Sequence, residues 1–179
     1  MSITFHEDLR LFEIQLRSTS YLFGINEKGI LQQVYWGETV DARECGYLLK
    51  SHHHSSFDAE LEREMEEYGC WGGSSYVEPC LKARFHDGVR DLKMAYIGYE
   101  IQSTDTLIVQ LKDVYYDFAV NIHYKMVYHL DLIERHVEVW NQSKEDIVIE
   151  QLMSAAWSLP SLSDYRLTHV SGRWAGNSS

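Results

Sequence analysis

The sequence predicts an all-β protein built as a sandwich of antiparallel strands. Three observations lead to this prediction. Long segments alternate apolar and polar residues with a period of two, turn residues separate them at intervals of about ten residues, and the chain carries 12 Tyr and 5 Trp, types that strands favour. At 179 residues, the chain can form one well-packed domain or at most two small ones.

Strand signals in the first half of the chain begin at residue 10. Residues 10–25 are rich in aromatic and branched types and predict one strand, residues 26–29 predict a turn, and residues 30–36 predict the second strand. Further on, Asp87 and Gly88 tolerate positive φ angles, so they predict a type I′ turn between two strands.

The second half of the chain shows clearer alternation. Residues 106–113 predict a strand, and a longer one follows. One of its faces carries Phe118, Val120, Ile122, Tyr124, Met126 and Tyr128, and the other carries Asn121, His123 and Lys125. The next strand places Ile133, Val137 and Val139 opposite Glu134, His136 and Glu138. Residues 146–157 predict a last strand.

Residues 55–69 are the one segment that predicts a helix. Ser55 stands where a helix cap would, Leu61, Met65 and Tyr68 form an apolar stripe, and Gly69 is suited to end the helix. The acidic residues between them predict a solvated face. This helix lies in an irregular segment, residues 37–75, of the kind that often carries function on a β scaffold.

Charge and composition exclude several classes of protein. With 27 acidic and 16 basic residues the net charge is -11, which argues against nucleic acid as a partner. No apolar run is long enough to span a membrane, and the first residues have no pattern of an export signal. The odd number of cysteines (Cys45, Cys70 and Cys80) indicates reduced thiols, so the sequence predicts a cytoplasmic location.

The sequence predicts no cofactor, no metal and no catalytic residue. His52 and His54 could share one ion in an extended segment, but no third ligand stands at a suitable spacing, and a polar loop is the better interpretation. Phosphate-binding glycine motifs and the nucleophile elbow are absent. The chain shows no pair of carboxylates suited to glycoside hydrolysis.

Two further features each leave two interpretations open. His123 and His136 lie on polar faces of neighbouring strands, where they could catalyse proton transfer at a sugar or simply pair in solvent, and pairing is favoured. Trp71, flanked by Gly69 and Gly72, could be held out as a platform for sugar rings or could plug the edge of the sandwich.

Four segments carry a resemblance to a known family. They are residues 34–37 (VYWG), 68–92 (beginning YGCWGG), 131–141 (DLIERHVEVWN) and 152–176 (containing SAAWSLP and YRLTHVSGRWAG). In this order they resemble the N-terminal domain of bacterial α-galactosidases of glycoside hydrolase family 36. Residues 52–58 (HHHSSFD) depart from the Asp-Arg-x-Phe-Ser motif common in that family.

The resemblance implies a domain at residues 1–176, with residues 177–179 as the chain end or the start of a linker. It implies a large twisted supersandwich, similar to that of galactose mutarotase, that packs on a catalytic (β/α)8 barrel absent from this chain. The parent enzyme would hydrolyse terminal α-galactosides with retention of configuration, and this chain alone would be inactive. Its partners would be the barrel, an α-galactoside oligosaccharide and further copies in a homo-oligomer.

Position and residue type select candidate site residues within this resemblance. Trp71, Phe57 and Trp36 are candidates for the rim of the substrate pocket, and Arg173 and Trp174 are candidates for the interdomain seam. Two alternatives remain beside this reading. One is a free-standing carbohydrate-binding module that uses Trp71, and the other is a mutarotase-like sugar epimerase that uses His123 or His136.

Overall fold

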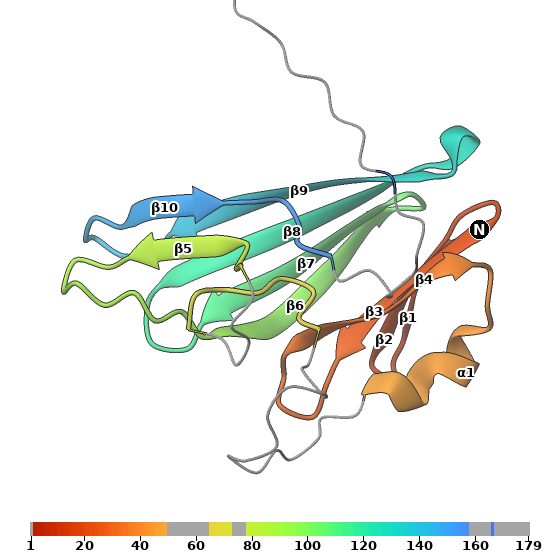
Figure 1. Ribbon diagram of the computed structural model, residues 1–179, viewed down its shortest axis with the longest axis horizontal. Helices are drawn as coiled ribbons and strands as arrows, with labels where there is room; N and C mark the ends of the chain where they lie inside the picture. The colour runs from red at the N-terminus through yellow and green to blue at the C-terminus, as the bar shows by residue number, and fades with distance from the viewer. Residues whose placement is uncertain (1, 50–64, 73–77, 158–165, 167–179) are drawn as a thin grey trace, which may run out of the picture.

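The computed structural model describes residues 2–49, 65–72, 78–157 and 166, and it confirms the predicted antiparallel β-sandwich (Figure 1). One four-stranded sheet has the order β1-β2-β3-β4, a second has the order β6-β7-β8-β9, and β5 and β10 form a two-stranded ribbon. All pairings between these strands are antiparallel. The strands are β1 (Ser2–His6), β2 (Leu11–Gln15), β3 (Thr19–Ile25), β4 (Leu31–Glu38), β5 (Leu81–Arg84), β6 (Met94–Ser103), β7 (Thr106–Asp113), β8 (Phe118–Val127), β9 (Leu132–Asn141) and β10 (Val148–Leu152).

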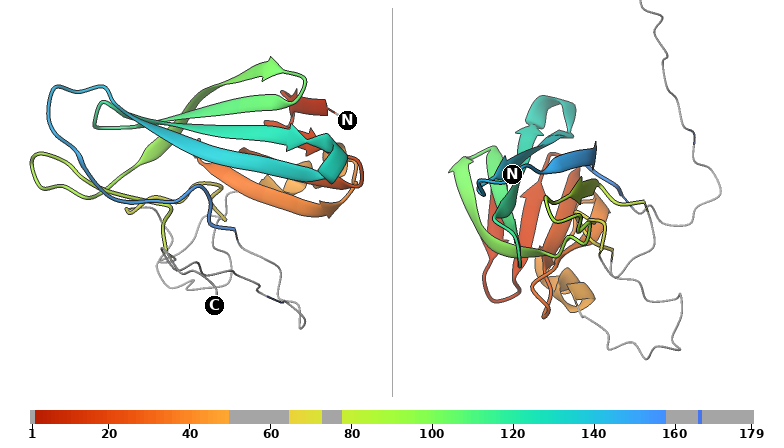
Figure 2. Two further views of the ribbon diagram at one scale, coloured as in Figure 1. Left: turned by 90° about the horizontal axis from the view of Figure 1, so that it is seen from above. Right: turned by 90° about the vertical axis from the view of Figure 1, so that its left-hand side faces the viewer.

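The two four-stranded sheets enclose the main hydrophobic core, and the ribbon extends from them toward one end of the molecule (Figure 2). Aromatic rings join the two layers. Phe23 of β3 stacks on Phe12 of β2 with ring centroids 5.0 Å apart, and on Tyr124 of β8 at 4.9 Å. All three side chains are fully buried, so they hold the sheets together at the centre of the sandwich.

The strands predicted in the second half of the chain are confirmed. The predicted residues 106–113 coincide with β7, and Phe118, Val120, Ile122, Tyr124 and Met126 of β8 all face the core. In β9, Ile133, Val137 and Val139 pack against this core, and Glu134, His136 and Glu138 are exposed. Tyr128 was placed wrongly, because the chain leaves the strand there and enters the short 3-10 helix η2 (Tyr128–Leu130).

The first half of the chain differs from the prediction in its strand count. Residues 10–25 form two strands, because the polar pair Arg17 and Ser18 turns the chain between β2 and β3. The backbone N–H of Leu16 donates to the carbonyl oxygen of Thr19 and closes this turn. The edge strand β1 was not predicted at all.

The two predicted turns have different outcomes. The turn at residues 26–29 is confirmed, with the Gly29 N–H donating to the Asn26 carbonyl oxygen and Gly29 at φ 77°. The type I′ turn at Asp87 and Gly88 was wrong, because only Gly88 has a positive φ, at 87°. In addition, the strands on either side of this turn do not pair with each other, since β5 pairs with β10 and β6 pairs with β7.

The predicted helix at residues 55–69 is not supported where it can be checked. Residues 55–64 lie outside the described part of the chain, and residues 65–69 form a bridge and a turn. The described α-helix, α1 (Ala42–Cys45), lies earlier in the same long segment and continues into the 3-10 helix η1 (Gly46–Leu49). A short helix in the long loop is therefore confirmed as a feature, but at another position.

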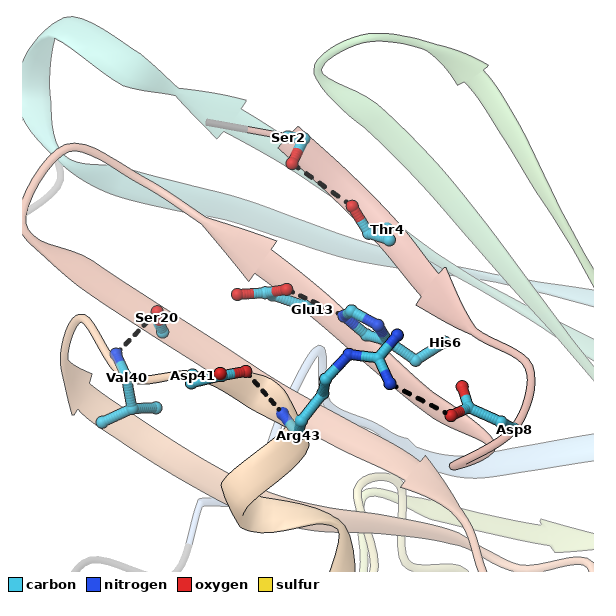
Figure 3. A network of polar contacts seen from close by, with 9 residues as sticks. All are labelled: Ser2, Thr4, His6, Asp8, Glu13, Ser20, Val40, Asp41 and Arg43. Atoms are coloured by element: carbon cyan, nitrogen blue, oxygen red, sulfur yellow. Dashed lines mark hydrogen bonds and ion pairs between the residues drawn. The ribbon is translucent and has the colours of Figure 1, made fainter.

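Helix α1 covers the outer face of the first sheet. Ala42 and Leu49 pack on Leu11 and Leu22 in a second, smaller core. Polar contacts fix the segment at its edge (Figure 3): the Asp41 side chain accepts from the Arg43 N–H at 2.9 Å and caps the helix. The first sheet therefore has apolar packing on both faces, against the main core on one side and against this smaller core on the other.

Asp131, in the turn between β8 and β9, ties the second sheet to the turn between β2 and β3 of the first sheet. It has a left-handed backbone conformation, with φ 56°. Its carboxylate accepts hydrogen bonds from the N–H groups of Arg17 and Ser18, at 2.9 and 3.2 Å, and from the Ser18 hydroxyl. This hydroxyl, followed by the two backbone donors, lowers the pKa of Asp131.

Two predictions about the environment of the chain can be compared with the structure. Within the described ranges, no helix is long and apolar enough to cross a membrane. Cys45, Cys70 and Cys80 are all free thiols, and the latter two are buried.

Candidate functional site: an aromatic pocket over a buried ion pair

A small pocket opens where the two sheets meet the end of the ribbon. Its volume is about 30 Å³, enough for one or two water molecules. Its lining comes from both sheets and from one residue a few positions after β10, and consists of Tyr21, Trp36, Tyr124, Ile133, Arg135 and Trp157. Four of these six side chains are aromatic, so the mouth of the pocket is an apolar surface with a few polar groups.

Trp36 and Trp157 form the outer part of the pocket. Their ring centroids lie 5.3 Å apart, and they are 48% and 44% exposed. Tyr21 supports this pair from below, with its ring edge-on to Trp36 at 5.9 Å. Two half-exposed indoles held in one place offer an apolar platform to a sugar ring or to another protein surface.

An ion pair lies beneath the platform. Glu67 is 1% exposed, and the Arg135 Nη1 donates to its carboxylate at 2.6 Å. A second guanidinium nitrogen, Nη2, donates to the Glu67 carbonyl oxygen at 2.9 Å, so one arginine binds both the side chain and the backbone of the same residue. The fit between the two groups compensates for the cost of removing both charges from water.

Two tyrosines complete the coordination of the Glu67 carboxylate. The Tyr21 hydroxyl donates to it at 2.6 Å and the Tyr124 hydroxyl at 2.7 Å. The Trp157 Nε1 donates to the Tyr21 oxygen at 3.2 Å, so a chain of hydrogen bonds runs from the surface to the buried carboxylate. The guanidinium of Arg135 also lies 5.1 Å from the Tyr124 ring centre and 5.9 Å from that of Trp157.

Backbone pairing with β4 positions Glu67. The Gln33 N–H donates to the Met65 carbonyl oxygen at 2.7 Å, and the Glu67 N–H donates to the Leu31 carbonyl oxygen at 2.8 Å. Residues 65–67 therefore run beside β4, and the carboxylate of Glu67 turns into the sandwich. The prediction that the acidic residues here form a solvated face was wrong for Glu67, because Arg135 supplies its counter-charge from a distant strand.

Burial raises the pKa of Tyr21 and Tyr124 well above the ordinary value, and the negative charge of Glu67 raises the pKa of both further. Burial also raises the pKa of the Cys80 thiol to about 11. These groups therefore stay neutral in the folded protein at pH values where they ionise in the unfolded chain.

We expect stability to fall in alkaline solution for this reason. The pKa of an unfolded tyrosine is about 10, and below that pH a tyrosine with a raised folded-state pKa contributes its full stability. As pH rises above about 10, this contribution to the free energy of unfolding is lost, by up to about 1.4 kcal/mol per pH unit for each tyrosine. Urea denaturation between pH 8 and pH 11 measures the effect. Tyr21→Phe should be less stable at pH 8, because a hydrogen bond to Glu67 is lost. It should nevertheless lose less stability than the wild type between pH 9.5 and pH 11, and equal losses would contradict this explanation.

The saturated coordination of Glu67 limits its chemistry. Its carboxylate accepts from two hydroxyls and one guanidinium and is closed to solvent. A general acid or base must reach substrate directly or through one water. The ion pair is therefore suited to fixing the geometry of the pocket, and the indoles above it are the groups that can contact another molecule.

Of the predicted site residues, the structure describes Trp36 and Trp71, and these two lie in different places. Trp36 lies in the pocket, whereas Trp71 is not part of its lining. Phe57, Arg173 and Trp174 lie outside the described residues. The rim of the substrate pocket formed by Trp71, Phe57 and Trp36 therefore stays a prediction. Of the three, Trp36 lines the aromatic pocket.

Trp71 has a different environment. It is 48% exposed, and Lys82 and Arg90 lie over its ring at 5.5 and 6.0 Å. Gly72, at φ 106°, turns the chain directly after it, and a Cβ added there would lie 1.8 Å from the Asp91 carboxylate. The tight glycine turn beside Trp71 is confirmed, but its indole already has cationic neighbours.

Sequence reasoning missed most of this site. Glu67, Arg135, Tyr21, Tyr124 and Trp157 were not among the predicted functional residues. Arg135 carried a usable signal, because it occupies an inward position of β9 between Ile133 and Val137. A charged residue at an inward position of a half-buried strand implies a buried partner.

The fold and this site define a class: a β-sandwich domain whose exposed aromatic pocket sits on a buried ion pair. Sequence comparison assigns the chain to a family within this class. The family model for the glycosyl hydrolase family 36 N-terminal domain matches residues 29–178. The chain belongs to this family of N-terminal domains.

The relatives of the chain are much longer proteins. It is 22% identical to alpha-galactosidase AgaA of Geobacillus stearothermophilus, over 97% of this chain and 27% of the relative. It is 25% identical to alpha-galactosidase 1 of Pediococcus pentosaceus, over 85% of this chain and 24% of the relative. The chain therefore spans about a quarter of the length of the relatives that it matches.

Solved structures share the fold. The alpha-galactosidase from Lactobacillus brevis superposes with a TM-score of 0.74 at 22% identity, covering 86% of this chain and 24% of that one. The galactosidase domain of the alpha-galactosidase-sucrose kinase AgaSK gives a TM-score of 0.75 at 21% identity, covering 86% of this chain and 25% of that one.

Three of the four segments that carry the family resemblance meet at the pocket. Trp36 comes from the VYWG segment, Arg135 from DLIERHVEVWN and Trp157 from SAAWSLP, and all three line the same pocket. Asp131, also in DLIERHVEVWN, ties the sheets together. These motifs thus have a structural explanation within this domain.

Proposed function

We propose that this chain is the non-catalytic N-terminal domain of an α-galactosidase that hydrolyses terminal α-galactosides with retention of configuration. The observation that carries the proposal is the family match over residues 29–178 in a chain that spans about a quarter of its α-galactosidase relatives. The remaining three quarters of the parent protein would hold the catalytic barrel. On this proposal residues 1–176 are the domain, a supersandwich, and residues 177–179 begin the connection to the barrel.

The surface near the pocket supports docking of a further domain. Exposed apolar side chains run along β10 and the residues after it: Val148, Ile149, Leu152, Met153 and Trp157. Several exposed apolar side chains within one short segment are typical of an interface. Arg173 and Trp174 would lie at the same seam.

The location and assembly of the parent protein follow the same proposal. Two buried, unpaired thiols, Cys70 and Cys80, are typical of a reducing compartment, which supports a cytoplasmic enzyme. The seam or the platform could also contact another copy in a homo-oligomer.

The test of this proposal is hydrolysis of a chromogenic α-galactoside. We expect no turnover by the purified chain and turnover by the full-length product of its gene. Hydrolysis by the chain alone would contradict the proposal, as would a full-length product that is inactive on α-galactosides but active on another glycoside class, such as α-N-acetylgalactosaminides.

A second candidate function, binding of an α-galactoside oligosaccharide by the platform, is favoured by the exposed Trp36 and Trp157 pair. A structure of AgaA A355E D548N from Geobacillus stearothermophilus, of similar fold with a TM-score of 0.69, was determined in complex with raffinose. Titration of this chain with raffinose, followed by tryptophan fluorescence, tests for binding. Saturable binding that is lost in Trp36→Ala and kept in Trp71→Ala would assign it to the platform. The reverse pattern would assign it to Trp71, and no binding would leave docking as the function of the pocket.

A further inference from the structure

His123, His136 and Glu138 meet on the outer face of the second sheet, away from the pocket. His123 of β8 and His136 of β9 are direct cross-strand partners, and Glu138 pairs with Asn121 one step along the same face. Strands β8 and β9 run side by side over most of their length (Figure 1). The three side chains therefore come from rigid, paired strands.

The possible ligand atoms of these three side chains all lie within 4.8 Å of one another. The two imidazole rings are nearly parallel, 10° apart, with centroids at 4.3 Å. The His123 Nε2 lies 3.3 Å from the Glu138 Oε2, yet it is buried and forms no hydrogen bond with any described residue. The two atoms are close enough to share an ion but are not in hydrogen-bond geometry, so a cation between them would satisfy the buried nitrogen.

We propose that His123, His136 and Glu138 form a binding site for a transition-metal ion of the zinc type. Two imidazoles and one carboxylate are ligands that Zn²⁺ accepts, and a set of three protein ligands leaves one position for water or another molecule. The sequence predicts no metal site because these three ligands become neighbours only when β8 pairs with β9. Their spacing along the chain does not match a metal-binding motif.

The geometry requires one small adjustment. Ligand atoms about 2.1 Å from a tetrahedral Zn²⁺ lie about 3.4 Å from one another. The separation between the His123 Nε2 and the Glu138 Oε2 already has this size. His136 is exposed, so its ring can turn out of the stack and direct a nitrogen to the same ion without disturbing the core.

Calorimetric titration of the full chain with Zn²⁺ tests the site. Because His52, His53 and His54 could also bind metal, the experiment uses a background in which these three are replaced by Ser. We expect one Zn²⁺ per chain in this background. His136→Ala should weaken binding at least about tenfold and Glu138→Gln by a similar factor, as for the loss of groups that hold a metal. His86→Ala replaces another exposed histidine and serves as the matched control, with unchanged binding expected.

A second readout separates loss of the site from loss of the fold. Zn²⁺ that binds the folded chain should raise its thermal midpoint, and His136→Ala should abolish this rise while leaving the midpoint without metal nearly unchanged. No zinc binding in the background lacking His52–His54 would overturn the proposal. Equal binding by the background, His136→Ala and Glu138→Gln proteins would overturn it as well.

Discussion

Replacement of Glu67 by Gln is expected to lower the free energy of unfolding by about 3–5 kcal/mol. The substitution keeps the size of the side chain but removes the charge that compensates Arg135, whose side chain is only 3% exposed. Breaking a buried ion pair by removing one partner leaves an uncompensated buried charge, which is the costly outcome. The Tyr21 and Tyr124 hydroxyls also lose their charged acceptor.

Urea denaturation at pH 7 measures this loss. The matched control is Glu134→Gln, the same change at the neighbour of Arg135 in the sequence, where the side chain is exposed on the outer face of β9. We expect a change within about 0.5 kcal/mol for this control. If Glu67→Gln were no more destabilising than Glu134→Gln, the ion pair could not be what holds the pocket in place.

Replacement of Phe23 by Ala should destabilise the domain by a similar amount, about 3–5 kcal/mol. Phe23 is fully buried and stacks on Phe12 in its own sheet and on Tyr124 in the facing sheet. Its loss removes apolar contact and opens a cavity at the contact between the two sheets. The hydrogen bonds of Asp131 to Arg17 and Ser18 also join the two sheets, which limits how far the sheets can move to close this cavity.

Thermal and urea unfolding of Phe23→Ala, beside the control Tyr115→Ala, provide the measurement. Tyr115 is 75% exposed in a turn, so its truncation should change stability by about 0.5 kcal/mol or less. A Phe23→Ala protein as stable as the Tyr115→Ala protein would show that the aromatic contact between the sheets is not central to the core.

The sequence predicted the fold well where local pattern decides structure. In β8 every second residue from Phe118 to Met126 is apolar, and all five of these residues are buried on one face. It predicted poorly where polar residues decide the course of the chain. Arg17 and Ser18 turn the chain between β2 and β3 because the Asp131 carboxylate, far along the sequence, accepts from their N–H groups.

The site was less predictable than the fold for the same reason. The acidic run containing Glu67 has the pattern of a solvated helix, and only the approach of β9 converts this residue into a buried one. Trp157 gains its role from the donation of its Nε1 to Tyr21, a residue near the other end of the chain. Such contacts depend on the packing of the two sheets, so no local window of sequence contains them.

The most direct test of the account is reconstitution of the enzyme from two parts. The parent protein lacking this domain is produced separately, mixed with the chain, and assayed for binding by gel filtration and for hydrolysis of a chromogenic α-galactoside. We expect the two parts to co-elute and α-galactosidase activity to rise on mixing, with a weaker effect when the chain carries Trp36→Ala and Trp157→Ala together. Activity in the chain by itself, or a fully active remainder that does not bind the chain, would contradict the account.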